Sequence, residues 1–152
     1  MKVYIMRHGE AGYHALSDAD RALTDYGVEQ SRAAALWLKS QSIQLDYALV
    51  SPYLRAKQTF EAVSGIMPIH HVETCDALTP DGSSQFIADY LSILATKQWQ
   101  SVLIVSHLPL VGYLVNELCP AVTPPMFATA SIACVTLSAE GKGELVWQHR
   151  VA

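Results

Sequence analysis

Three short apolar runs, each leading directly into polar residues, constrain the fold of this chain more than any other feature. They cover residues 2–6, 47–50 and 102–106, and the last is continuously apolar up to Ser106. Runs of this length and character are typical of strands buried on both faces of a parallel sheet. The stretches between them have helical periodicity, so strands and helices alternate. The sequence therefore predicts an α/β fold, a three-layer sandwich with a mostly parallel central sheet and helices on both faces.

Capping residues set the expected limits of the first two helices. The hydroxyl of Thr24 can cap a first helix, whose apolar face includes Val28 as part of a hydrophobic staple. Ser51 and Pro52 suit the N-cap and first helical position of a second helix, which ends near Gly65.

The remaining segments extend the same pattern. Two residues at helical spacing, Ile87 and Leu91, predict a third helix. The other expected elements are a strand at residues 69–72, a loop at 77–84, a helix from Pro109, and an antiparallel hairpin of 132–137 with 144–149. The connections are too short for an inserted cap domain, so we expect a single domain over residues 1–152.

Composition narrows the function. With 51% hydrophobic residues the chain can bury a full core, and its net charge of -4 argues against a nucleic-acid partner. No apolar run approaches the length of a membrane span, and we see no targeting segment. Three widely spaced cysteines, at positions 75, 119 and 134, fit reduced thiols in a cytoplasmic protein.

The residues with the most informative chemistry follow the apolar runs. Arg7 and His8 follow the first run and precede Gly9, which we expect to let the backbone turn; Arg55 lies one turn beyond the second run, and His107 follows the third. Because the carboxyl ends of parallel strands meet at one edge of a sheet, where ligands bind in open α/β folds, we expect these side chains to converge.

A doubly charged anion would explain this set. Arg55 stands in the first turn of a helix, where a cation opposes the helix dipole unless an anion is bound there. Two arginines and two histidines with no nearby carboxylate would repel one another unless a dianion lay between them. Phosphoryl transfer needs such cations around its equatorial oxygens. Arginines also disfavour a bound metal ion, so we expect no metal and no cofactor.

These motifs resemble those of the histidine phosphatase superfamily, which includes the phosphoglycerate mutases. The resemblance rests on the Arg-His-Gly signature at residues 6–10, the second arginine segment at 49–59 and the second histidine segment at 104–107. The short chain, the 18–27 segment and the 107–112 segment look most like the SixA-type phosphohistidine phosphatases.

The resemblance implies a phosphoglycerate mutase-like fold and a role for each motif residue. His8 would be the nucleophile and form a phosphohistidine intermediate, and Arg7, Arg55 and His107 would complete the phosphate pocket with Gly9. His8 must be neutral to attack, so we expect its second ring nitrogen to donate to a backbone carbonyl or a carboxylate. Arg21 has two alternatives: to reach the mouth of the pocket, or to pair with a surface aspartate.

A proton donor for the leaving group is missing from its usual places in this family. Leu108 stands where related phosphatases carry an aspartate, and only Asp76, Glu10 and Asp18 are candidates. An alkoxide leaving group benefits from a positioned acid by about 10²–10⁴-fold. Imidazole leaving from phosphohistidine is a weaker base and needs none.

We therefore hypothesise a protein phosphohistidine phosphatase whose partner is a phosphorylated signalling or phosphotransfer protein. One alternative is a small-molecule phosphomonoesterase or mutase of the same superfamily. Another, of a different class, is a non-catalytic module that only binds phosphate or other oxyanions.

Overall fold

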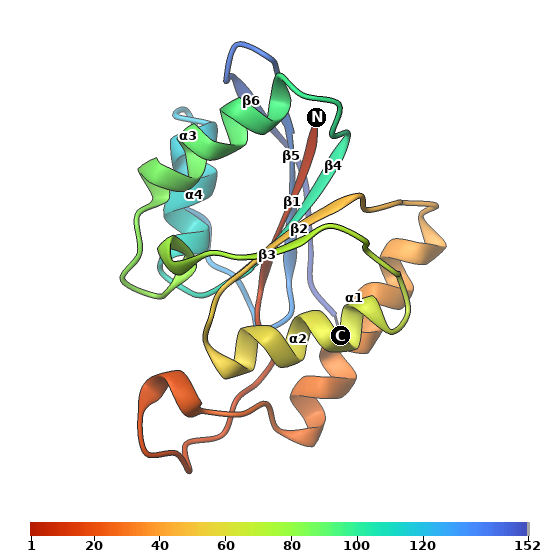
Figure 1. Ribbon diagram of the computed structural model, residues 1–152, viewed down its shortest axis with the longest axis vertical. Coiled ribbons are helices and arrows are strands. Elements are labelled where there is room, and N and C mark those ends of the chain that lie inside the picture. Colours follow the sequence, from red (N-terminus) through yellow and green to blue (C-terminus); the bar gives the residue numbers. More distant parts are fainter. Residues whose placement is uncertain (152) are drawn as a thin grey trace.

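A computed structural model describes residues 1–151 and contains one six-stranded sheet (Figure 1). The strand order is β3-β2-β4-β1-β5-β6. The first four strands in the chain pair in parallel, and the last two form an antiparallel hairpin that extends the sheet from β1. The strands are β1 (Lys2–Arg7), β2 (Tyr47–Val50), β3 (Val72–Thr74), β4 (Ser101–Ser106), β5 (Ile132–Leu137) and β6 (Gly143–His149).

Helices cover both faces of this sheet, which confirms the predicted three-layer α/β architecture (Figure 1). Side chains alternate along β1: Val3 and Ile5 belong to the core beneath α3 and α4, whereas Tyr4 and Met6 belong to the core beneath α1 and α2. The helices are α1 (Asp25–Ser40), α2 (Leu54–Ser64), α3 (Ser84–Ala95) and α4 (Leu110–Leu118), with short 3₁₀ turns η1 (Asp18–Asp20) and η2 (Asp76–Leu78).

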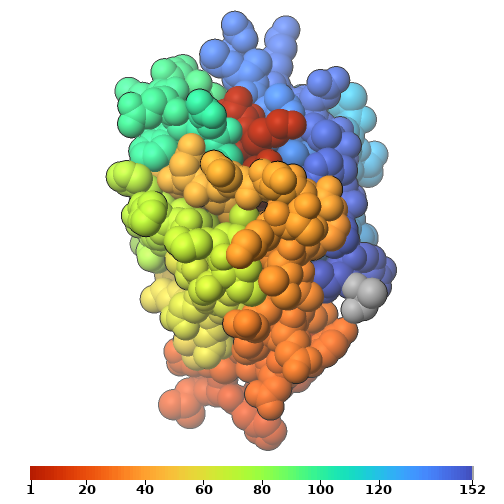
Figure 2. All heavy atoms as spheres, turned by 90° about the vertical axis from the view of Figure 1, so that its right-hand side faces the viewer, coloured from red at the N-terminus to blue at the C-terminus, as the bar shows by residue number. Residues whose placement is uncertain are grey.

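The register of the parallel strands aligns their carboxyl ends. Arg7 lies opposite Ser106 across the β1–β4 pair, and Val50 lies opposite Val105 across the β2–β4 pair. The residue that follows each strand therefore emerges at the same edge. The segment between β1 and α1 extends beyond this edge and forms one end of the molecule (Figures 1 and 2).

Two helix predictions need correction. Thr24 does cap α1, since its hydroxyl accepts a hydrogen bond from the Gly27 N–H, but Val28 is 38% exposed rather than part of the core. The reason is that Gly27 packs directly on the backbone of Glu10, which turns the face bearing Val28 outward.

The start of the second helix was also predicted too early. It begins at Leu54 with Tyr53 as N-cap, because Ser51 still pairs with β4 through its N–H, which donates to the Val105 carbonyl oxygen. The end at Gly65 is as predicted.

Strand β3 lies at residues 72–74 and not at 69–72. Ile69 instead turns into the core shared with α1 and α2, so the chain reaches the sheet only afterwards. The other strands lie within a residue of their predicted limits.

Within residues 1–151, no helix combines the length and apolar character needed to cross a membrane. The same residues contain no group of three or more His, Cys, Asp or Glu side chains placed to hold a metal ion. The three cysteines are buried and free.

Candidate active site

His8 stands immediately after β1 and is held in one protonation state. Its Nδ1 lies 2.7 Å from the carbonyl oxygen of Gly9, which can only accept, so Nδ1 carries the ring proton. Nε2 therefore carries no proton, and its lone pair accepts a hydrogen bond from the Nε–H of Arg55 over 3.3 Å. Burial, followed by Arg55 and Arg7, lowers the pKa of His8 to about 4. The predicted contact of the second ring nitrogen with a backbone carbonyl is confirmed.

Arg55 is a buried cation in the first turn of α2. Besides its contact with His8, its Nη1 donates to the backbone oxygen of Asp18 and its Nη2 to the Asp18 carboxylate over 3.1 Å. The guanidinium also lies against the Tyr53 ring, at 5.1 Å. Asp18 thus compensates part of the charge that the helix dipole opposes.

His107 follows β4 and faces His8, with the ring centroids 5.1 Å apart. Its Nε2 lies 2.7 Å from the Ser51 hydroxyl. Burial, followed by the neighbouring His8 and Arg55, lowers its pKa to about 3. His107 is therefore neutral near pH 7.

Arg7, at the end of β1, completes the cluster. Its Nη1 donates to the carbonyl oxygen of Phe127 over 2.9 Å, and burial followed by the charge of Arg55 lowers its pKa. Within residues 1–151, the buried side-chain polar atoms without a hydrogen-bond partner are Arg7 Nε and His107 Nδ1. Leaving such groups unsatisfied costs about 1–3 kcal/mol each, and an oxyanion between them would supply acceptors.

Gly9 is needed for close packing, not for a left-handed turn. A Cβ at this position would lie 2.4 Å from the Gly27 carbonyl oxygen, so the chain after β1 could not rest on α1. Its N–H donates to the Thr59 hydroxyl and its carbonyl accepts from His8, so Gly9 orients the His8 ring. Thr59 was missed from the sequence, although it stands one helical turn after Arg55 on the same face of α2.

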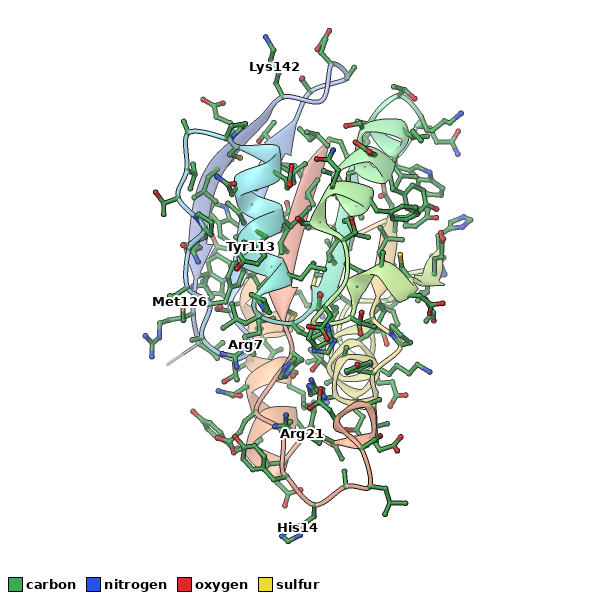
Figure 3. All side chains as sticks on the ribbon, turned by 90° about the vertical axis from the view of Figure 1, so that its left-hand side faces the viewer. Arg7, His14, Arg21, Tyr113, Met126 and Lys142 are labelled. Atoms are coloured by element: carbon green, nitrogen blue, oxygen red, sulfur yellow. The ribbon has the colours of Figure 1, made fainter. Side chains whose placement is uncertain are left out.

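Arg21 pairs with Asp18, the second of its two predicted alternatives. Its Nη1 lies 3.0 Å from the Asp18 carboxylate, and its guanidinium lies over the Tyr13 ring. Asp18 therefore bridges Arg21 to Arg55. Figure 3 places Arg7 and Arg21 at the same end of the sheet, with His14 farther out in the loop.

None of the three candidate acids makes the contacts expected of a proton donor. The hydrogen bond from Arg21 is the main cause that lowers the pKa of Asp18, and Arg55 lowers it further. The Asp18 carboxylate is therefore ionised. Glu10 accepts a hydrogen bond from the Thr24 hydroxyl at the start of α1. Asp76 is exposed in η2.

Known proteins resemble this chain over most of its length. Residues 3–79 match the sequence model of the histidine phosphatase superfamily, branch 1. The chain is 49% identical over 149 residues to the phosphohistidine phosphatase SixA of Escherichia coli strain K12, covering 97% of this chain and 92% of that protein. It is 43% identical over 141 residues to the SixA homologue of Haemophilus influenzae, covering 88% and 86% of the two chains.

The chain belongs to the histidine phosphatase superfamily. A solved structure of the protein histidine phosphatase SixA complexed with tungstate superposes with a TM-score of 0.97 at 48% identity, covering 99% of this chain and 97% of that one. The phosphoglycerate mutase-like fold expected from the motifs is thereby confirmed.

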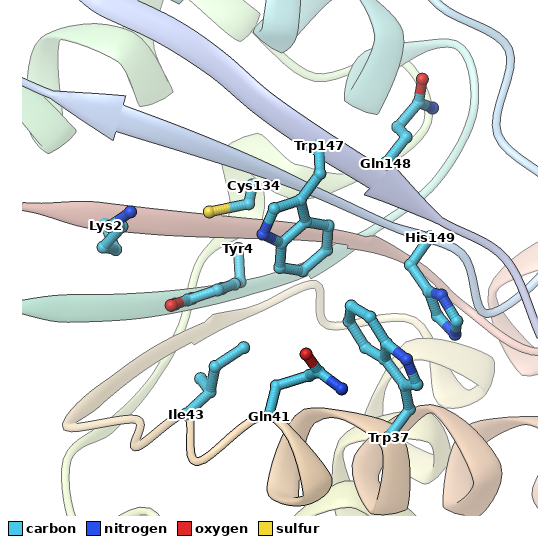
Figure 4. Close-up of a pocket in the computed structure, with 9 residues that line it drawn as sticks. All are labelled: Lys2, Tyr4, Trp37, Gln41, Ile43, Cys134, Trp147, Gln148 and His149. Carbon is cyan, nitrogen blue, oxygen red and sulfur yellow. The ribbon is translucent and has the colours of Figure 1, made fainter.

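Arg7 and Arg55 lie at one edge of the sheet, beside His8 and His107. A separate hollow of about 340 Å³ lies between α1 and the strands β1, β5 and β6 (Figure 4). In its lining the Trp37 ring stacks on His149 and meets Trp147 edge-on. Its one cationic lining residue outside histidine is Lys2, so it does not resemble a phosphate pocket.

Proposed function

We propose that this protein is a protein phosphohistidine phosphatase, which removes the phosphoryl group from a phosphorylated histidine of a signalling or phosphotransfer protein. The observation that carries the proposal is a neutral His8 whose Nε2 lone pair accepts from Arg55, beside two buried nitrogens without a hydrogen-bond partner, Arg7 Nε and His107 Nδ1. A nucleophile and groups that can hold an oxyanion therefore lie together.

The geometry supports a two-step reaction through a covalent phosphohistidine. In the first step His8 Nε2 attacks phosphorus and the P–N bond to the substrate imidazole breaks, so that a neutral imidazole leaves with the electron pair of that bond and the proton that its other ring nitrogen already carries. In the second step water attacks phosphorus, the bond to Nε2 breaks with its electron pair returning to Nε2, and inorganic phosphate leaves with both protons of the water. Arg55 Nε, which holds the lone pair at rest, then donates to an equatorial oxygen together with Arg7 and His107.

The carboxylates around the pocket favour a leaving group that needs no acid. Asp18 is ionised by its arginine partners, Glu10 is committed to Thr24, and the position after His107 is Leu108. Phosphoramidate hydrolysis is the reaction that this set of residues can assist without a further proton donor.

The surface near the pocket supports a protein substrate. Tyr13 and Leu16, from the segment that carries Asp18 and Arg21, are 84% and 104% exposed, and Met126, next to Phe127, is 81% exposed. Apolar side chains exposed to this degree beside a reactive site are typical of protein contact surfaces. The relatives named phosphohistidine phosphatase point the same way. The free, buried cysteines support a cytoplasmic location.

A competition assay tests the proposal. A phosphorylated histidine phosphotransfer domain and a panel of phosphate esters are offered together, and we expect rapid loss of phosphate from the domain with little ester turnover. Labelled phosphate should be trapped on His8 after quenching under conditions that preserve phosphohistidine, and His8→Ala should trap none. Preferred turnover of an ester would favour a phosphomonoesterase, and full activity of His8→Ala would favour a binding module.

A further inference from the structure

We propose that Ser51 is a positioning residue that fixes the tautomer of His107, so that Nδ1 of this ring carries the proton offered to a bound oxyanion. The tautomer is a property of the resting protein and does not depend on the proposed function. Only the expected loss of activity rests on that function.

The Ser51 hydroxyl carries a single proton, which it can donate to only one neighbour. The oxygen has two hydrogen-bonding neighbours: the backbone N of Tyr53 at 3.2 Å and Nε2 of His107 at 2.7 Å. A backbone N–H can only donate, so the hydroxyl accepts from Tyr53. The oxygen has a second lone pair, but if it also accepted from His107 its own proton would have no partner, whereas donation to Nε2 gives that proton an acceptor. Nε2 is therefore unprotonated, and the ring proton of neutral His107 lies on Nδ1.

Because both residues are buried, the hydrogen bond between them determines the tautomer of His107. Ser51 is 0% exposed and His107 is 1% exposed, so water is not at hand to replace either partner. The Tyr53 ring packs edge-on against the imidazole at 5.1 Å. In the opposite tautomer the hydroxyl proton would lose its acceptor, and Nδ1 would present a lone pair to an anion, which repels it.

The sheet brings these two residues together although 56 positions separate them. Ser51 directly follows β2, His107 directly follows β4, and the Ser51 N–H donates to the Val105 carbonyl oxygen over 3.0 Å. The hydroxyl thus meets the imidazole at the edge where the strands end. His107 then serves as a neutral donor at Nδ1, where it has no partner within residues 1–151.

Nitrogen NMR of the wild-type protein tests the tautomer directly. The ¹⁵N shifts of His107, assigned by comparison with His107→Gln, should show a protonated Nδ1 and an unprotonated Nε2 at pH 7. A protonated Nε2 would overturn the proposal, and this result does not depend on any variant folding or on any enzymatic activity.

Removing the hydroxyl tests its role. In Ser51→Ala the two ring forms should mix, tungstate affinity should weaken, and kcat/KM for phosphohistidine should fall by about 10- to 100-fold, the usual size of losing an orienting partner. The matched control is Ser101→Ala, which removes a buried hydroxyl bonded to the Gln44 carbonyl oxygen at the other end of β4. Wild-type values of tungstate affinity and tautomer in folded Ser51→Ala would overturn the proposal; if no phosphatase activity existed at all, these two measurements would still decide it.

Discussion

The Nε atom of Arg55 lies 3.3 Å from Nε2 of His8, so the first turn of α2 holds the lone pair that would attack phosphorus. The same guanidinium is anchored by Asp18 on its other side. The planar guanidinium group of Arg55 therefore links His8 and helix α2 to the 12–22 segment.

Replacing the guanidinium group of Arg55 with an ammonium group should slow the reaction. Arg55→Lys keeps the cation but cannot hold Asp18, His8 and an oxyanion together, so we expect kcat/KM for phosphohistidine to fall by about 100- to 1,000-fold. Steady-state kinetics measure the loss. Arg32→Lys, on the exposed side of α1, is the matched control and should be unchanged. Comparable rates for the two variants would argue against a role of the Arg55 guanidinium group.

The buried, neutral His8 should make stability depend on pH. The pKa of His8 is about 4 in the folded protein and about 6.5 in the unfolded chain. As the pH falls from 6.5 towards 4, the unfolded chain therefore binds a proton at this residue and the folded protein does not. Between pH 6.5 and 5 this residue should lower the free energy of unfolding by about 2 kcal/mol, with no such loss above pH 7. Urea unfolding of the wild type and of His8→Gln measures the difference, which should vanish if His8 titrates normally.

Asp18 should act on the arginines and not as an acid. Asp18→Asn removes the charge that pairs with Arg55 and Arg21, so we expect it to change turnover of phosphohistidine and of a phosphate ester by the same factor. The ratio of the two rates is the measurement. Asp20→Asn, in the same turn, is the control. A selective loss of ester turnover in Asp18→Asn would identify this residue as the missing proton donor.

The contact between Gly9 and Gly27 predicts a severe effect of one methyl group. In Gly9→Ala the new Cβ would meet the Gly27 carbonyl oxygen at 2.4 Å, so the chain must shift, at a cost of roughly 2 kcal/mol or more. In Gly12→Ala the nearest atom is 4.0 Å away, and stability should hardly change. Thermal unfolding compares the two, and equal midpoints would contradict the packing argument.

The exposed Leu16 should matter only for a protein substrate. In Leu16→Ser we expect KM for a phosphorylated phosphotransfer domain to rise by about tenfold, because an apolar contact is lost, while turnover of a small phosphoramidate stays the same. Leu36→Ser on α1 removes a leucine that is 55% exposed away from this segment and serves as the control. Equal effects on both substrates would place the docking surface elsewhere.

The layered fold could be predicted because hydrophobic runs and capping residues act locally. The strands β1, β2 and β4 follow from apolar runs, and Thr24 caps α1 as its position indicated. Val28 was misassigned because its exposure depends on how closely Gly27 packs on the chain after β1, a contact that no local pattern encodes.

By itself, the sequence determined that Arg7, His8, Arg55 and His107 would meet, because residues that follow parallel strands share one edge of the sheet. Only the tertiary structure decided how they bond. The Ser51 hydroxyl binds His107 across the sheet, and the exposed Asp18 reaches back to bind the buried Arg55. Hydrogen bonds depend on distances of about 3 Å and on the direction of each donor, and side chains far apart in the chain acquire these only when the sheet has formed.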